Sequence, residues 1–316
     1  MSISLKKSLG LSAATSLVIG SVVGSGIFIS TPAMARSLPS VQSVFFVWIL
    51  AGVLTLMGAL TQGEIASRIP ETGGLYKYFK IIFGSEVAFF YGWANFTIAG
   101  SGAIAGLAYI CASYFGEIVP IPHFADSFAK VALHLPWLGD LYPLANLSEK
   151  IIGSVIILLL TAINVRGVQT GSRVQMASTA CKIVAIAAVV LTCFFYKGQS
   201  QLSVETLTST WGLKSGSWMV FLGLCFASLS GAFWSYDGWG NVAYISGEVK
   251  DAKSNLPKAI IYGTLAVVFL YLILNLAYFW VLSFEEVGKV AGDRIAAAAI
   301  QKALGSASAV TALAAM

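Results

Sequence analysis

Apolar runs of about 20 residues alternate along this chain with shorter polar segments. A run of that length is what a helix needs to cross the roughly 30 Å hydrocarbon core of a membrane. The runs expected to form spans are 11–35, 41–66, 85–118, 151–165, 174–196, one that begins near 218, and 259–282. A last apolar run, 303–316, would reach only about 21 Å as a helix. The pattern predicts an all-α, polytopic membrane protein whose sequence ends within an eighth span.

Composition and charge agree with this class. The chain is 57% apolar and only 10% charged, which is too apolar for a soluble domain of this size. Met1–Lys7 is too short and too polar for the apolar region of a signal peptide, so we expect the first span to remain in the mature protein. Lysine and arginine are about twice as dense in the segments on the N-terminal side of the membrane, which favours a cytoplasmic N-terminus.

The segments between spans carry no metal-type pattern. The cysteines lie inside apolar runs and are expected to pack in the core. Pro70 and the pair Gly73-Gly74 forbid one continuous helix over 63–84, which predicts a re-entrant segment or a short surface helix. Glu64 and Arg68 are spaced to form an ion pair on one helical turn. Residues 119–148 are interpreted as an interfacial loop with a short amphipathic helix, in which His123 and His134 are solvated. No metal or cofactor is predicted.

The first span is interrupted by glycine. Residues 15–31 read TSLVIGSVVGSGIFIST, so Gly20, Gly24 and Gly26 alternate with small polar residues. Glycine loosens a helix, and loosened backbone inside a membrane is tolerated only where it is buried in protein or lines a cavity. The stretch is therefore either a binding element or a place where two helices pack closely.

A second interruption, GAFWSYDGWGN at 231–241, lies in the sixth span. Two interrupted spans at corresponding positions of two halves indicate an inverted-repeat transporter with a site near the bilayer midplane. The start of a half-helix suits an anionic group, and the carbonyls that end the preceding half suit a cation. Together the breaks suit a zwitterion. No nucleophile–base pair, metal-ligand cluster or phosphate loop indicates an enzyme.

Four ordered motifs carry a family resemblance. The runs GSVVGSGIF, GEIASRIPETGGLYKY, NVRGVQTGSRVQ and FWSYDGW…EVKDAKSNLPKAI resemble the amino acid–polyamine–organocation superfamily, and most closely its L-type amino acid transporter branch and bacterial relatives. The resemblance covers essentially the whole chain. It implies a five-plus-five inverted-repeat fold with discontinuous first and sixth helices in one transmembrane domain (1–316). Residues 11–196 would form the first repeat, and 218–316 an incomplete second repeat, truncated within the eighth helix.

The resemblance also implies a set of substrate-binding residues. Ser25 and Gly26 would bind the substrate carboxylate through helix N–H groups and the serine hydroxyl, while carbonyl groups of the first and sixth helices would bind its ammonium. Trp234 would act as an aromatic gate, although a packing or interfacial tryptophan is the alternative. An acidic side chain at Asp237 could select cationic groups, titrate, or face a water-filled vestibule. The expected set is Val22, Gly24, Ser25, Gly26, Trp234, Tyr236, Asp237 and Gly238.

Lys182 is a charged residue inside the fifth span. An ionisable side chain inside a membrane costs free energy and therefore indicates a functional role. The alternative is that the long Lys182 side chain extends its ammonium to the membrane interface. The flanking RVQMASTACKIVAIA resembles the family segment whose lysine reaches the first helix, where related transporters hold sodium. Lys182 would then be a permanent tether, as in exchangers, or a group that titrates during proton-coupled symport.

These observations predict secondary active transport of an amino acid across the inner or plasma membrane by alternating access. The transport would be sodium-independent exchange or proton-coupled symport. The alternative is a non-transporting permease copy, or a membrane-embedded binding or sensor component. We expect residues 1–316 alone to be unable to transport, because alternating access needs helices from both repeats. The partners expected are an amino acid and the lipid bilayer, with no nucleic acid; a second copy, an accessory chain and the identity of the amino acid stay open.

Overall fold

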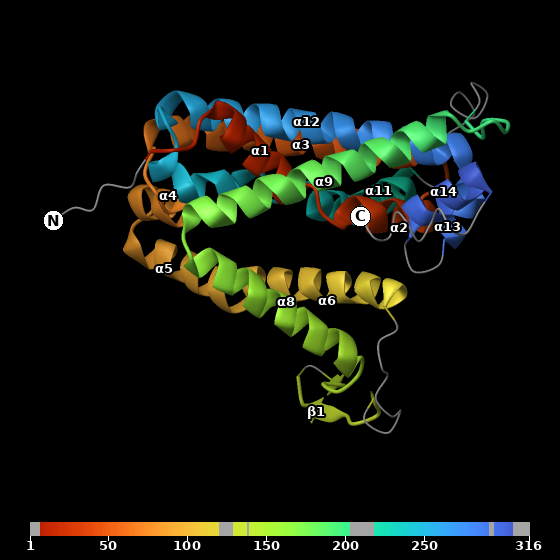
Figure 1. Cartoon of the computed structure of the whole chain (residues 1–316), viewed down its shortest axis with the longest axis horizontal. Helices are drawn as coiled ribbons and strands as arrows, with labels where there is room; N and C mark the ends of the chain where they lie inside the picture. Colours follow the sequence, from red (N-terminus) through yellow and green to blue (C-terminus); the bar gives the residue numbers. More distant parts are fainter. Residues whose placement is uncertain (1–6, 120–128, 138, 203–217, 291–293, 306–316) are drawn as a thin grey trace. The chain divides into compact units, whose positions relative to one another are not determined.

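The computed structural model describes residues 7–119, 129–137, 139–202, 218–290 and 294–305 (Figure 1). The chain forms two compact units, one running from the N-terminus to Phe89 and resuming at Arg173, and the other spanning Phe90–Ser172. Nearly all of the regular structure is α-helical.

The first unit holds both interrupted spans. Its elements are α1 (Leu11–Val22), α2 (Gly26–Ser37), α3 (Val41–Arg68), α4 (Gly74–Ile82), the start of α5 (Ser85–Ala94), most of α9 (Val168–Phe194), α11 (Trp218–Tyr236), the 3₁₀-helix η2 (Trp239–Glu248), α12 (Ala252–Val281), α13 (Phe284–Lys289) and α14 (Ile295–Leu304). Helices α1, α3 and α12 run side by side (Figure 1). An aromatic cluster lies at the centre of this bundle, where Trp48 packs edge-on against Tyr236 and Tyr271.

Both predicted breaks are present. Helix α1 ends at Val22, α2 begins at Gly26, and the two axes are bent by 42°. The second break falls at Asp237–Gly238, where Gly238 adopts a φ of 109° that glycine tolerates and most residues do not. The second half of the sixth span continues as the 3₁₀-helix η2 rather than as an α-helix. Trp234, expected at the start of the break, lies in the last turn of α11.

The second unit is a helical pair with a short hairpin. It holds the rest of α5, the π-helix η1 (Asn95–Ala99), α6 (Gly100–Ile118), β1 (Leu133–Leu135), β2 (Gly139–Leu141) and α8 (Leu147–Val165). The π-helix is followed by Gly100, where a Cβ atom would lie only 2.9 Å from the Asn95 carbonyl oxygen. Helices α6 and α8 pack where Gly153 approaches the backbone of Ala108.

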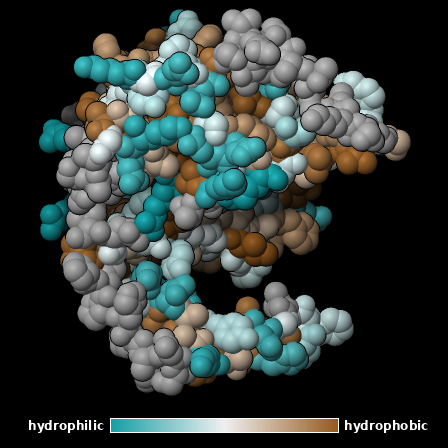
Figure 2. All heavy atoms as spheres, turned by 90° about the vertical axis from the view of Figure 1, so that its right-hand side faces the viewer, coloured by the Kyte–Doolittle hydropathy of each residue, from teal (hydrophilic) through white to brown (hydrophobic). Residues whose placement is uncertain are grey.

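The described spans match a membrane protein. Six helical stretches are long and apolar enough to cross a membrane, and the bent pair α1–α2 makes a seventh. Figure 2 views the molecule from the end that carries α13 and α14, where hydrophilic side chains gather among apolar ones. Charged residues of these two helices, such as Glu286 and Lys302, lie outside the spans. The chain is a multi-pass membrane protein.

Several helix boundaries differ from the predicted spans for one reason. The seventh helix begins at Ala252 rather than at 259, and the fifth at Val168 rather than at 174. In both places the helix continues through polar residues beyond the apolar run, so hydropathy locates the membrane-embedded part and misses the extension. The fourth helix likewise begins at Leu147 rather than at 151.

The segments between spans are partly as predicted. Residues 74–82 form the short helix α4, and Arg68 pairs with Glu64 at 2.6 Å between Nη2 and Oε1. The hairpin β1–β2 was not predicted, because strands of three residues leave little pattern. In it His134 is exposed and pairs with Asp140 at 2.7 Å. His123 and the predicted final span from 306 onward lie outside the described residues.

Candidate functional site at the two helix breaks

The two breaks lie against each other. A Cβ atom at Gly26 would lie 2.6 Å from the Cα of Ser235, so the start of α2 contacts the end of α11. A Cβ atom at Gly238 would lie 2.7 Å from the carbonyl oxygen of Ser21, so the second break contacts the end of α1. Glycine is required at both positions because the backbones approach too closely for a side chain. The interrupted spans thus pack closely against each other, and the two breaks lie at one place.

The start of α2 offers donors that the protein itself does not use. Among the described residues, no backbone hydrogen bond takes up the N–H groups of Ser25, Gly26 or Ile27. The Ser25 side chain does not cap its own helix, and its buried Oγ has no partner in the described part of the chain. A helix N-terminus carries roughly half a positive charge. This end of the break is therefore suited to a carboxylate.

The carbonyl groups at the end of α1 face Lys182. The Lys182 ammonium donates to the Val23 carbonyl at 2.8 Å and to the Gly20 carbonyl at 3.3 Å. Lys182 lies near the middle of the membrane-spanning part of α9, Thr170–Phe194. Its ammonium is held by the break, so snorkelling to the interface is excluded in this conformation. The lysine supplies a positive charge at the negative end of the α1 dipole.

Tyr271 of α12 forms hydrogen bonds with carbonyl groups at the helix ends that Lys182 does not contact. Its hydroxyl lies 3.1 Å from the Val22 carbonyl oxygen and 3.0 Å from the Ser235 carbonyl oxygen, where it donates to one or the other. Val22 and Ser235 belong to the ends of α1 and α11 respectively. Tyr271 therefore joins the ends of two half-helices, and each carbonyl keeps a lone pair for a ligand.

Two buried polar contacts fix α2 against its neighbours. The Ser30 hydroxyl lies 2.9 Å from the Ser235 hydroxyl on α11. The Thr31 hydroxyl donates to the Asn275 side-chain oxygen on α12 at 2.6 Å, and the Asn275 amide nitrogen donates to the Tyr271 carbonyl. Buried hydrogen bonds that are fully satisfied favour a single packing arrangement. The start of α2 is thus held in register with both helices.

The remaining expected site residues lie in different surroundings. Tyr236 is 1% exposed, and its hydroxyl donates to the Trp48 carbonyl, so its side chain forms part of the core below the break. Trp234 is half exposed in the last turn of α11, whereas the next two residues, Ser235 and Tyr236, are buried. Asp237 is exposed at the break. A Cβ at Gly24 would make an ordinary van der Waals contact, 3.8 Å from the Val22 carbonyl oxygen.

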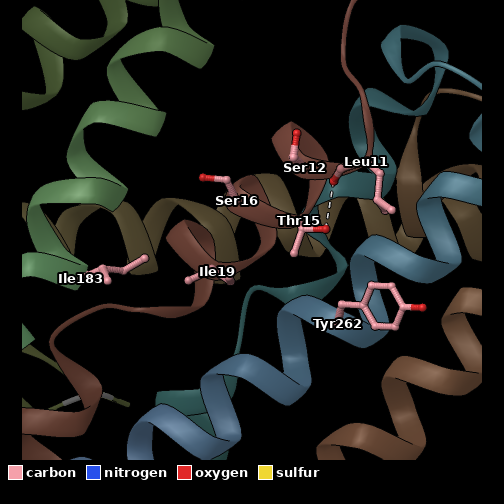
Figure 3. A pocket seen from close by; sticks show the side chains of 7 residues that line it. All are labelled: Leu11, Ser12, Thr15, Ser16, Ile19, Ile183 and Tyr262. Atoms are coloured by element: carbon pink, nitrogen blue, oxygen red, sulfur yellow. Dashed lines mark hydrogen bonds between the residues drawn. The ribbon is translucent and has the colours of Figure 1, made fainter. Parts of the chain in front are cut away.

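A groove of about 700 Å³ lies elsewhere on the first unit. It is lined by α1, by Ile183 of α9 and by Tyr262 of α12, and its walls are mainly apolar (Figure 3). Thr15, one of the polar residues along it, donates its hydroxyl to the Leu11 carbonyl at 2.9 Å (Figure 3). None of the free donors at the start of α2 lines this groove, so the groove and the site at the breaks are distinct.

The sequence profile of the family described as "Amino acid permease" matches residues 9–316, which is almost the entire chain. The chain belongs to the amino acid permease family. Both breaks and Lys182 fall within the matched region, and so does the aromatic cluster beneath them. The predicted resemblance to the amino acid–polyamine–organocation superfamily is confirmed.

Individual relatives are transporters and exchangers by name. The chain is 31% identical over 283 residues to the serine/threonine exchanger SteT of Bacillus subtilis, covering 90% of this chain and 57% of that protein. It is 28% identical to the human b(0,+)-type amino acid transporter 1, covering 92% of this chain and 56% of the transporter. It is 29% identical to the human Asc-type amino acid transporter 1, covering 90% of this chain and 50% of that transporter. This permease sequence spans about half the length of these relatives.

Sequence reasoning missed Tyr271 and Ser235. Tyr271 lies within a long apolar run, where a tyrosine resembles any other packing residue. Ser235 lies within the sixth-span motif, but it was not singled out among its aromatic neighbours. The only signal in the sequence would have been a polar atom in the middle of a span, since such groups need a partner there.

Proposed function

We propose that this chain binds the α-carboxylate and α-ammonium of an amino acid at the two breaks, as part of a transporter that carries the amino acid across the membrane. The observation that supports this most directly is that the donor groups at the start of one half-helix lie close to the carbonyl groups at the ends of two others. Unused N–H groups and the Ser25 hydroxyl begin α2, while carbonyls end α1 and α11. In this proposal Ser25 and Gly26 bind the carboxylate, and the carbonyls of Val22, Trp234 and Asp237 bind the ammonium.

The site is proposed to work without sodium. The Lys182 ammonium already donates to two carbonyls of the first break, where a coupling cation would otherwise be attracted. A fixed positive charge at that position needs no ion from solution. Of the two couplings open to such a lysine, we propose exchange, because one relative is named a serine/threonine exchanger and because both lysine contacts are made within the protein.

The proposed cycle is alternating access in the cell membrane. Residues 11–196 would be the first repeat and 218–316 an incomplete second repeat, each of which begins with its interrupted span. Trp234, half exposed beside the break, would close over the bound amino acid. The N-terminus is proposed to be cytoplasmic, on the basis of the lysine and arginine distribution.

The experiment is a counterflow assay in liposomes, with the protein expressed from its complete gene. Vesicles loaded with unlabelled serine or threonine should take up labelled amino acid, and unloaded vesicles should not. Replacing sodium with N-methylglucamine should leave the rate unchanged. Uptake into unloaded vesicles driven by a pH gradient would overturn exchange in favour of proton symport. Binding without any uptake would support the alternative of a binding or sensor component.

A further inference from the structure

The short helix α4 connects the ends of two membrane spans. Helix α3 ends at Arg68, α4 covers Gly74–Ile82, and α5 begins at Ser85. Helix α4 lies at one end of the bundle of α1, α3 and α12 (Figure 1). The connections on both sides of α4 are short, and an extended chain spans at most about 3.5 Å per residue. Helix α4 therefore stays close to the membrane surface at which these two spans end.

One face of α4 is fixed to the rest of the first unit. Tyr78 is 1% exposed and belongs to an apolar cluster that also contains Leu9 and Val249. Gly74 lies against Tyr244 of η2, whose ring would be 2.8 Å from a Cβ atom at the glycine. These contacts fix the rotation of α4 about its axis and determine which of its side chains point outward.

The opposite face of α4 carries two aromatic rings and a lysine. Tyr76, Lys80 and Phe83 are spaced four and three residues apart, which places them on one side of the helix. Tyr76 and Phe83 are 40% and 62% exposed, and Lys80 is also exposed. A helix face of this composition is typical of the headgroup layer, where aromatic rings reach the upper acyl chains and a lysine ammonium stays in the polar layer. We call these three residues the aromatic–lysine face.

Positive charge is in excess at this end of the first unit. The two acidic residues that precede α4 are already paired, Glu71 with Lys77 and Glu64 with Arg68, both at 2.6 Å between nitrogen and oxygen. Lys80 forms no ion pair within the described residues. Among those residues, the exposed lysines here outnumber the carboxylates outside ion pairs: Lys7, Lys80, Lys250, Lys253 and Lys258 against Glu86, Glu248 and Asp251.

We propose that the aromatic–lysine face of α4 binds the headgroup of an anionic phospholipid, on the side of the membrane where the chain begins. The Lys80 ammonium contacts the lipid phosphate, and the rings of Tyr76 and Phe83 pack against the upper part of the acyl chains. The excess of lysines favours an anionic over a zwitterionic headgroup. The proposal is independent of the transport function, because α4 lies outside the two helix breaks.

Lipid binding to the protein expressed from its complete gene and purified in detergent tests the proposal. Phosphatidylglycerol and phosphatidylcholine are titrated separately, and bound lipid is counted by native mass spectrometry. Lys80→Gln should lower the affinity for phosphatidylglycerol about fivefold, the effect of one lysine near an anionic surface, and should leave the affinity for phosphatidylcholine unchanged. Lys197→Gln is the matched control, since Lys197 is exposed beyond the end of α9 and outside this face. It should bind both lipids as the wild type does.

Three results would overturn the proposal. The first is equal affinity of the wild type for the two lipids. The second is a loss of phosphatidylglycerol binding in Lys80→Gln that is no larger than the loss in Lys197→Gln. The third is displacement of the lipid by glycerol 3-phosphate at a similar concentration, which would show that a free phosphate compound is the ligand.

The depth of Phe83 in the membrane provides a readout that does not depend on losing binding. Phe83→Cys, in a protein whose native cysteines are replaced by alanine, is labelled with an environment-sensitive fluorophore and reconstituted in vesicles that contain phosphatidylglycerol. A nitroxide near the top of a lipid acyl chain should quench it at least twofold more than a water-soluble nitroxide. The same label at Glu285→Cys on α13, where the side chain is 83% exposed, should show the reverse. Stronger quenching of Phe83→Cys by the water-soluble nitroxide would place the face in water, and the proposal would be wrong.

Discussion

The Lys182 ammonium lies 2.8 Å from the Val23 carbonyl oxygen, across the break that separates α1 from α2. Together with the hydrogen bond to the Gly20 carbonyl, this contact links the fifth span to the proposed amino acid site. It places a fixed charge where the end of a half-helix carries partial negative charge.

Replacing Lys182 with methionine should lower counterflow at least tenfold, because the carbonyls of Gly20 and Val23 lose their donor and a side chain of similar length remains. The matched control is Lys197→Met, since Lys197 is exposed just beyond the end of the same helix. Rates are measured in proteoliposomes with equal protein content. Wild-type uptake that rises with sodium would contradict this account of Lys182.

Removing the Tyr271 hydroxyl should weaken amino acid binding. In Tyr271→Phe the carbonyls of Val22 and Ser235 lose a shared donor, which should cost about 1 kcal/mol, or roughly fivefold in affinity. Tyr262→Phe is the control, because Tyr262 lies on the same helix but lines the separate groove. Equal affinities of the two variants in equilibrium binding would show that the Tyr271 hydroxyl does not organise the site.

Gly26→Ala should destabilise the protein by about 1–3 kcal/mol, because the added methyl would meet Ser235 and force α2 away from α11. Gly223→Ala on α11 is the control, since nothing lies within 4 Å of a Cβ there. Thermal unfolding in detergent compares them. An unchanged midpoint for Gly26→Ala would show that the two breaks do not pack as closely as described.

Neutralising Asp237 should separate two classes of substrate. Asp237→Asn should leave stability within about 0.5 kcal/mol, because the side chain is exposed. If the carboxylate faces the bound side chain, binding of a cationic amino acid falls at least tenfold while that of serine is retained. We expect this result, measured as competition against labelled serine. Equal retention of both would place the carboxylate in a water-filled vestibule.

Glu286 on α13 should give a small acid-dependent contribution to stability. Partial burial raises the pKa of Glu286, but hydrogen bonds from Lys302 and Ser283 outweigh this and hold the pKa below its usual value of 4.5. The ionised form therefore stabilises the folded state above about pH 4.5, and this stabilisation is lost as the pH falls through the lowered pKa.

The effect should not exceed about 1 kcal/mol, because the ion pair between Glu286 and Lys302 is partly exposed. Unfolding midpoints between pH 6 and pH 3 should fall less in Glu286→Gln than in the wild type. Glu285→Gln, which alters the more exposed neighbouring carboxylate, should follow the wild type. A Glu286→Gln profile identical to the wild type would contradict the assignment.

The sequence revealed the breaks because their causes are local. Glycine and small polar residues inside an apolar run weaken a helix wherever the chain goes, so the interruptions near Gly24 and Gly238 could be predicted from their own neighbours. The reach of Lys182 to the first helix was implied by resemblance, since no spacing within one helix specifies a contact with another. Its snorkelling alternative was excluded only by the hydrogen bonds to α1.

The other parts of the site depend on contacts between distant segments. Tyr271 joins α1 to α11 because α12 contacts both helices. Tyr236 turns toward Trp48 because α11 packs against α3. A parallel β-bridge likewise pairs Leu9 with Val249, 240 residues farther along the chain. No periodicity in a single sequence encodes such pairings. The roles assigned to the site residues stay predictions.

The most direct test of the central claim is equilibrium binding with ligands that lack one pole of the amino acid. Labelled serine is bound to the purified protein and challenged with unlabelled serine, with ethanolamine, which lacks the carboxylate, and with 3-hydroxypropanoate, which lacks the ammonium. If the start of α2 binds the carboxylate and the ends of α1 and α11 bind the ammonium, only serine should compete at similar concentration, with or without sodium. Equal competition by ethanolamine or by 3-hydroxypropanoate would contradict a site that binds both the carboxylate and the ammonium.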